Sequence, residues 1–262
     1  MSESPSASRR AVEERLAESP PALRAFFEQE LAFARAALAA GCSVEHLAAA
    51  LQAACERARK QLELAMDTRT VACRRGCSHC CHGLRVEVLA PEALNIASHL
   101  RRSLDRAELV ELSSALRARA QSARDMSSQE QWRAQTPCVF LDRASDSCTI
   151  YERRPIVCQF HHSLDRAQCE RAATDQDATI PRHAAAEDLY GLAQAALLLS
   201  CEERGMDARS LELASAVELA LGAHDVAERW ASGEPVFDDA AFRPRDEPFD
   251  AEDSPPLVTI RR

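Results

Sequence analysis

The chain has 262 residues, a net charge of -9 and a pI of about 5.5, so it is long enough for a sizeable core and too acidic for general nucleic-acid binding. It has only 7 Gly and 5% aromatic residues, and its abundance of Ala, Leu, Arg and Glu favours helices over a barrel or sandwich. No apolar leader is seen at the start and no apolar stretch approaches the ~20 residues of a membrane span, so we expect a cytoplasmic protein with no membrane partner.

The first part of the chain predicts a disordered start followed by a helical hairpin. Residues 1–20 are polar and rich in Ser, which is typical of a disordered terminus. From Pro21, apolar residues recur at helical spacing up to Gly41, and a second amphipathic run follows Ser43. Because the connection between them is short, we expect residues 21–67 to form an antiparallel pair of helices.

The middle of the chain, residues 68–172, has no regular pattern and contains most of the cysteines. Gly83–Ala90 alternates apolar and polar residues, which predicts a short strand. Pro91 opens a helix, and Leu104–Arg124 continues as an amphipathic helix. We therefore expect an irregular cysteine-rich module with at most short strands.

Helices are expected again after the module. Residues 173–231 contain two Leu-rich helical stretches, at about Ala184–Arg204 and at about Ala208–Trp230, the second interrupted near Gly222. Residues 232–262 combine many carboxylates with several prolines and indicate an extended acidic tail. The expected fold class is mainly α, with a helical framework around the cysteine module.

Eight cysteines of the module are candidate metal ligands. The first four lie in CRRGCSHCC, where they would share one face of a helix or stay within a few residues of each other in a loop. The other four are spread over PCVFLDRASDSCTIYERRPIVCQFHHSLDRAQC. Reduced cytosolic thiols that crowd in this way favour metal ligation over disulfides. The expected ligands are Cys73, Cys77, Cys80, Cys81, Cys138, Cys148, Cys158 and Cys169.

The residues around these cysteines suggest supporting roles. Eight thiols suffice for one four-thiolate site with spare cysteines, for two such sites, or for a polynuclear centre. Cations beside the cysteines would offset the negative charge of a thiolate centre: Arg74, Arg75, Arg153 and Arg154. Four histidines could replace a thiolate, although hydrogen bonding around the centre or a place on the surface is favoured for each: His79, His82, His161 and His162.

Three further cysteines, Cys42, Cys55 and Cys201, lie in the helical flanks, where packing is favoured over ligation. No Ser-His-Asp order or carboxylate pair rises above chance among 41 acidic residues, so we assign no catalytic residue.

The cysteine strings, with the Pro91-Glu92 helix start, PCVFL, CTIYERRPIVC and HSLDRAQC, resemble the YkgJ-like cysteine-cluster family, which is named for its CxxCxxCC signature. The resemblance covers about Cys73 to Cys169 and implies a zinc- or iron-chelating domain. One related branch is similar to the flagellin lysine methylases, in which such a cluster is associated with an iron–sulfur centre and S-adenosylmethionine. The chain has no recognisable glycine-rich nucleotide loop, so methyl transfer is the weaker alternative.

The spacing Cys73-x3-Cys77-x2-Cys80 is also that of radical S-adenosylmethionine enzymes, but their alternation of strands and helices is not seen here. The number of thiols and the family resemblance together favour an iron–sulfur cluster slightly over Zn²⁺. A zinc-chelating structural or binding protein is the alternative, and no protein partner is indicated.

Overall fold

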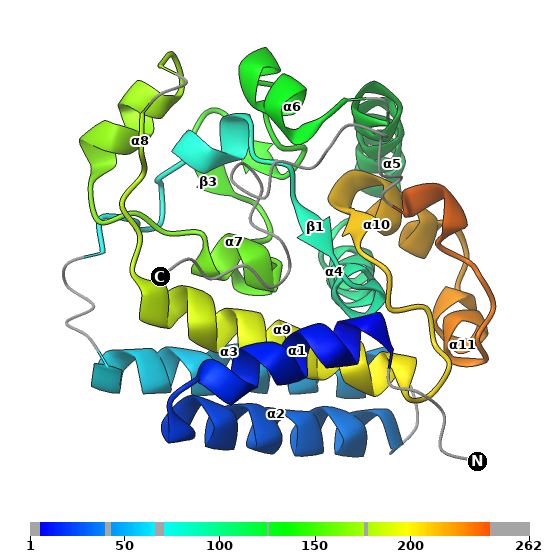
Figure 1. Cartoon of the computed structure of the whole chain (residues 1–262). Helices are drawn as coiled ribbons and strands as arrows, with labels where there is room; N and C mark the ends of the chain where they lie inside the picture. The colour runs from blue at the N-terminus through cyan, green and yellow to red at the C-terminus, as the bar shows by residue number, and fades with distance from the viewer. Residues whose placement is uncertain (1–5, 40–42, 66–70, 125, 176–177, 242–262) are drawn as a thin grey trace.

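The computed structural model describes residues 6–39, 43–65, 71–124, 126–175 and 178–241, which form eleven α-helices and two small sheets (Figure 1). The predicted mainly helical class is confirmed. Within these ranges no helix is both long and apolar enough to span a membrane. The helices are α1 (Ala7–Glu18), α2 (Pro21–Ala39), α3 (Val44–Ala65), α4 (Ala90–Ser103), α5 (Arg106–Ala123), α6 (Ser128–Ala134), α7 (Ile156–Phe160), α8 (Arg166–Ala172), α9 (Ala184–Glu202), α10 (Leu213–Gly222) and α11 (Val226–Ala231).

Short 3-10 turns and strands lie between and after the helices, most of them in the module. The turns are η2 (His79–His82), η3 (Tyr151–Arg153) and η4 (Asp238–Ala240). The strands form two antiparallel pairs: β1 (Glu87–Val88) with β4 (Leu211–Glu212), and β2 (Leu141–Asp142) with β3 (Ser147–Cys148). The strand expected over Gly83–Ala90 is therefore shorter than its alternating pattern suggested.

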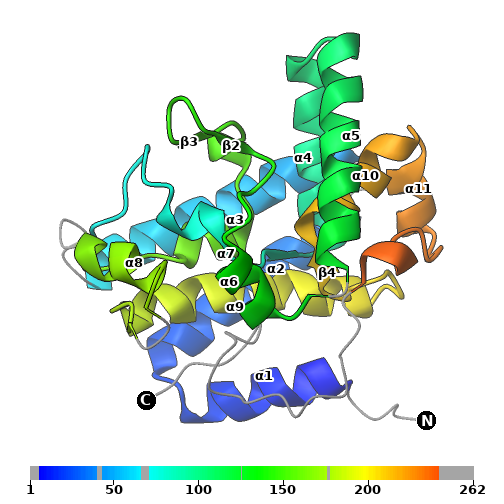
Figure 2. The same ribbon diagram turned by 90° about the horizontal axis from the view of Figure 1, so that it is seen from above.

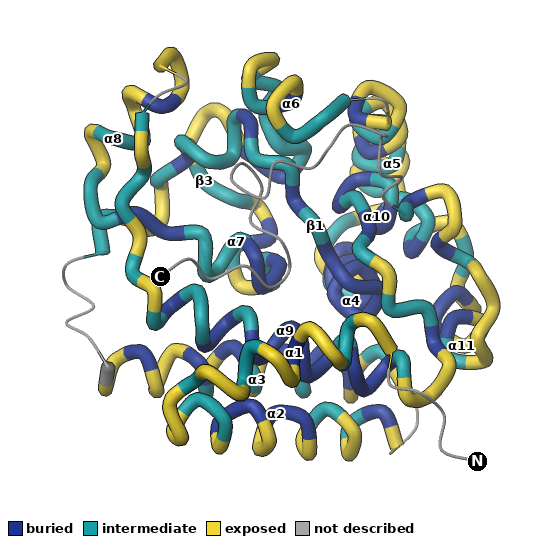
Figure 3. The backbone as a smooth tube through the Cα atoms, viewed as in Figure 1, coloured by how far each residue is buried: buried dark blue, intermediate teal, exposed yellow. Residues whose placement is uncertain are grey.

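The helices before and after the module pack together into its framework. The two helices expected in residues 21–67 are α2 and α3, which pack on each other and on α9. Phe26, Phe27 and Leu31 of α2 are buried in this contact layer. On the other side of the core, α10 packs on α4 and α5, and Figure 3 shows that α4 and α9 are largely buried.

The N-terminal segment is helical where its composition predicted disorder. Val12 is the buried residue of α1, which packs on α9. Arg9 pairs with Glu203 and Arg15 pairs with Asp188. Figure 2 shows α1 at the outer edge of the layer that contains α2, α3 and α9. Composition does not indicate this helix because its docking depends on ion pairs with residues far along the chain.

The region after Trp230 also differs from the prediction of an extended tail. Phe237 is fully buried, Ala240 is buried, and Ala241 forms an isolated bridge with Leu211 beside β4. The tail prediction for residues 242–262 lies outside the described residues. The apolar Phe237, rather than the acidic neighbours, determines the position of residues 236–241.

Candidate metal centre

Four of the predicted ligands come together from separate segments. Cys81 lies on η2, Cys148 on β3 and Cys158 on α7, and Cys138 precedes β2. Each of these four sulfurs is close enough for its charge to act on the other three. All four are half-buried, and none of the described cysteines forms a disulfide. We call Cys81, Cys138, Cys148 and Cys158 the inner quartet.

Backbone hydrogen bonds bring the segments of the inner quartet together. The Cys138 N–H donates to the Cys81 carbonyl oxygen at 2.7 Å. The pairing of β2 with β3 places Cys148 opposite Leu141, whose N–H donates to the Cys138 carbonyl oxygen at 3.0 Å. Asp146, in the turn between these strands, has a φ of 51°, a left-handed conformation that Asp tolerates better than most residues. The position of these three cysteines is therefore set by main-chain contacts.

Burial keeps most of the inner quartet protonated when no cation is bound. It raises the pKa of Cys138 to about 12, and it raises the pKa values of Cys148 and Cys158 as well. The opposite shift occurs at Cys81, where a hydrogen bond with the Cys80 thiol lowers the pKa to about 7. Because thiolates and not thiols ligate metals, binding of a cation here would release protons.

The donor set suits zinc or iron because both accept thiolate sulfur. Within the described residues, no three His, Cys, Asp or Glu side chains have their ligand atoms gathered around one point. A cysteine sulfur moves by rotation about a single side-chain torsion. Side-chain rotation is therefore the movement by which the inner quartet would have to close around a metal.

Two arginines place positive charge beside these thiols. The charge of Arg154 acts on three of the four sulfurs, among them Cys81 and Cys148, and that of Arg75 also acts on Cys148. The Arg154 guanidinium lies over the Tyr151 ring at 3.8 Å from the centroid, and its Nε donates to the Tyr151 carbonyl oxygen at 3.1 Å. Arg75 lies 5.1 Å from the same centroid. Both cations favour the thiolate form, as a centre with excess negative charge requires.

The other four predicted ligands lie around η2 and α8. Cys73 Sγ accepts a hydrogen bond from the Ser163 N–H at 3.3 Å, while the Ala72 N–H donates to the Ser163 carbonyl oxygen at 2.8 Å. The Cys73 thiol is hydrogen-bonded to that of Cys77 and interacts with the charge of Cys169. Cys73 is exposed and the others are half-buried. We call Cys73, Cys77, Cys80 and Cys169 the outer quartet.

The histidines beside the cysteines have contacts of their own. His162 Nε2 accepts from the His183 N–H at 2.8 Å, so its Nδ1 carries the proton and donates to the carbonyl oxygen two residues earlier at 2.5 Å. His162 is thus a structural link to the start of α9. His79 Nε2 lies 3.5 Å from Glu170 Oε1, and burial lowers the pKa of His161 to about 4. The supporting role expected for these histidines stays a prediction.

The described cysteines outside the module are buried, as is expected of cysteines that pack in the core. Cys55 Sγ accepts a hydrogen bond from Gln159 Nε2 at 3.3 Å, and burial raises its pKa to about 12. Cys201 is fully buried on α9. Cys42 lies outside the described residues.

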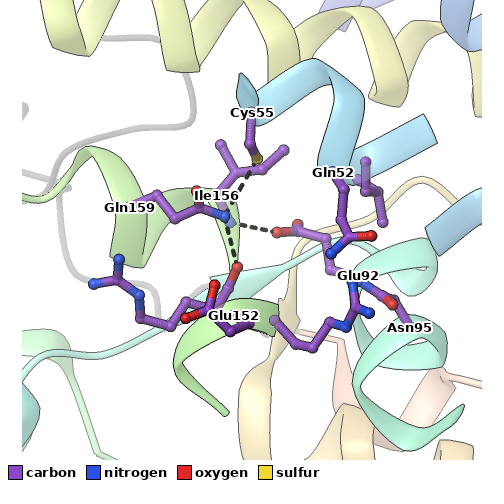
Figure 4. Close-up of a pocket in the computed structure, with 10 residues that line it drawn as sticks. Gln52, Cys55, Glu92, Asn95, Glu152, Ile156 and Gln159 are labelled. Atoms are coloured by element: carbon purple, nitrogen blue, oxygen red, sulfur yellow. Dashed lines mark hydrogen bonds between the residues drawn. The ribbon is translucent and has the colours of Figure 1, made fainter. Parts of the chain in front are cut away.

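Glu92 joins the helical framework to the segment that carries Cys158. Figure 4 shows it at a pocket between α3, α4 and α7, where its Oε1 accepts from the Ile156 N–H at 2.7 Å. Its Oε2 accepts from the Leu89 N–H at 2.9 Å. The cavity is about 20 Å³, the size of one water molecule. The sequence indicates Glu92 only as part of the Pro91-Glu92 helix start, because its contact with Ile156 spans 64 positions.

We expect Glu92→Gln to remove a pH dependence of stability. Burial raises the pKa of Glu92 from 4.5 to about 7, so the folded state binds the proton more tightly than the unfolded state does. The corresponding stabilisation is complete below pH 4.5 and is lost as the pH rises to about 7. Between pH 4.5 and 8 the unfolding free energy of the wild type should fall by about 3 kcal/mol relative to Glu92→Gln. Urea denaturation across this range measures the difference, and parallel curves would contradict it.

Comparison with protein-family models gives a match over the cysteine module. Residues 72–179 match the family model described as "CxxCxxCC: Putative zinc- or iron-chelating domain", which confirms the resemblance inferred from the sequence. The matched segment includes both quartets and extends seven residues past the predicted end of the module, 172. No curated protein and no solved structure matches the chain. The family supports metal binding by this segment and names zinc and iron equally.

Proposed function

From the match of residues 72–179 to a zinc- or iron-chelating domain, we propose that the chain binds an iron–sulfur centre through its eight module cysteines. The inner quartet is the observation that carries this proposal, because four thiols from separate segments interact with one another beside Arg154. Such convergence of reduced thiols is expected where a metal holds them together.

The choice of iron–sulfur over zinc depends on the number of thiols. One structural zinc uses only four of the eight thiols. A single iron–sulfur cluster is likewise held by four cysteine thiolates, so the number favours a polynuclear centre or more than one centre over one structural zinc. Arg154 and Arg75 would offset the negative charge of either kind of centre. The half-buried state of the inner quartet would limit solvent access, which is one factor that sets a cluster's potential.

Anaerobic purification should give a coloured protein. We expect broad absorbance near ~400 nm, with iron and acid-labile sulfide in matching amounts, because cysteine-bound clusters contain both. A Cys158→Ser variant should lose much of this absorbance, while Cys55→Ala, which alters a buried thiol outside the module, should keep it.

Zinc is the alternative that the same measurement detects. A colourless protein with stoichiometric zinc would mean that the cysteines form a closed zinc–thiolate site and not a cluster. Metal binding would then be coupled to folding of the module. Protein purified without any metal, and unable to take up zinc or iron, would contradict the proposed function altogether.

A further inference from the structure

The four thiols of the inner quartet all interact with one another. The strongest charge interactions of Cys158 and Cys138 with other ionisable side chains are with members of the same quartet. The main-chain bond from Cys138 to Cys81 and the pairing of β2 with β3 hold three of its segments together without any residue of α8. Four thiolates are the full ligand set of a tetrahedral zinc site or of a single iron–sulfur cluster.

The outer quartet has its own local framework. The Cys77 N–H donates to the Arg74 carbonyl oxygen at 3.0 Å, and Gly76 has a φ of 83°, which together form a turn that needs glycine at its third position. This turn brings Cys77 back to Cys73, to which it is hydrogen-bonded. The largest charge interactions of Cys73 are with Cys77 and Cys169 of the same quartet.

The helix that carries Cys169 is held against η2. α8 packs on η2, and the 3.5 Å contact of His79 Nε2 with Glu170 Oε1 joins residues that directly neighbour Cys80 and Cys169. The Ser163 bonds to Ala72 and Cys73 fix the start of the module near the residues that lead into α8. The first and the last cysteines of the module are thereby brought to the same place.

The two quartets meet at Cys80 and Cys81. Consecutive residues of a 3-10 helix such as η2 are rotated by about 120° around its axis, so these side chains leave the backbone in different directions. Cys81 interacts with all other members of the inner quartet. Cys80 is hydrogen-bonded to Cys81 and interacts with Cys81 and Cys158 of the inner quartet and, less strongly, with Cys73 of the outer quartet. Cys80 therefore lies at the border between the two quartets, and because the inner quartet already has four thiols, we assign Cys80 to the outer one.

We propose that the eight thiols form two separate four-thiolate metal centres, one on the inner quartet and one on the outer quartet, instead of one polynuclear centre. This inference rests on the proposed function and adds the number of centres and the ligands of each. It assigns the adjacent Cys80 and Cys81 to different metals. It also groups cysteines that lie far apart in the sequence, which their spacing does not indicate.

Cobalt binding by paired variants tests this division. Full-length protein is prepared metal-free under anaerobic conditions and titrated with Co²⁺ alone, whose sulfur-to-cobalt absorbance reports thiolate ligation. We expect about two Co²⁺ per chain for the wild type and for Cys55→Ala, and about one each for Cys148→Ser/Cys158→Ser and Cys73→Ser/Cys169→Ser. Each double variant removes two ligands of one quartet and leaves the other intact.

The other outcomes distinguish a failure of this inference from a failure of the proposed function. Loss of all cobalt in either double variant would show one shared centre and overturn the division, while metal binding itself would stand. A wild type that binds one Co²⁺, unaffected by Cys73→Ser/Cys169→Ser, would overturn the outer centre. A wild type that binds no metal would overturn the proposed function as well.

A second measurement on the wild type does not depend on the variants folding. Two separate cobalt sites should keep the full electron paramagnetic resonance intensity per ion at saturation. Thiolates shared between two metals would couple their spins and reduce the intensity, which would overturn the division.

Discussion

Removing the metal is expected to loosen the cysteine module far more than the helices that frame it. The module's elements are short, with η2 of four residues, α7 of five, α8 of seven and two-residue strands. Helices of this length are not stable alone, so the metal centres should supply much of the module's order. After chelation we expect amide exchange in η2, β3 and α8 to speed up by about 100-fold, or about 3 kcal/mol of local stability.

The framework offers an internal control for that experiment. α2 and α9 pack on each other through a largely apolar contact and contain none of the proposed ligands. Their amides should exchange at nearly the same rate with and without chelator, because their stability comes from core burial. Equal acceleration in α9 and α8 would mean that the chain unfolds as one unit, and no change in either would contradict a structural role for the metal.

The parts of the fold that the sequence predicts are those with local signals. Pro91 lies where α4 begins, and periodic apolar residues mark α2 and α9. These signals act within a few residues of the chain. For the same reason, the close spacing of the cysteines in CRRGCSHCC is enough to predict that their thiols cluster.

The parts that could not be predicted depend on long-range contacts. The proposed division of ligands groups Cys73 with Cys169 and Cys81 with Cys138, although Cys73 and Cys81 belong to one short string. Helical or loop geometry of that string alone suggests a single site. Only the bond from Cys138 to the Cys81 carbonyl and the contact of α8 with η2 separate its members.

Glu92→Ala is expected to destabilise the protein by about 3 kcal/mol or more. The substitution leaves the buried N–H groups of Leu89 and Ile156 without an acceptor, and each such loss costs about 1–3 kcal/mol. Glu108→Ala is the matched control, because Glu108 accepts from the Asp105 N–H in the same capping position of α5 but is exposed. Its cost should stay below about 1 kcal/mol, since water can replace the lost acceptor. Chemical denaturation of both variants compares the two costs.

The same pair of variants also tests whether the framework positions the metal ligands. Ile156 is the first residue of α7, which carries Cys158 two positions later, so release of its N–H should let this helix start shift. We expect Glu92→Ala to weaken Co²⁺ binding at the inner quartet by about 10-fold, the lower end of the effect of removing a group that orients a ligand. Binding at the outer quartet should stay unchanged, and Glu108→Ala should affect neither. If Glu92→Ala lowers stability but leaves both affinities intact, α7 is held in place by its packing on α9 and not by the carboxylate.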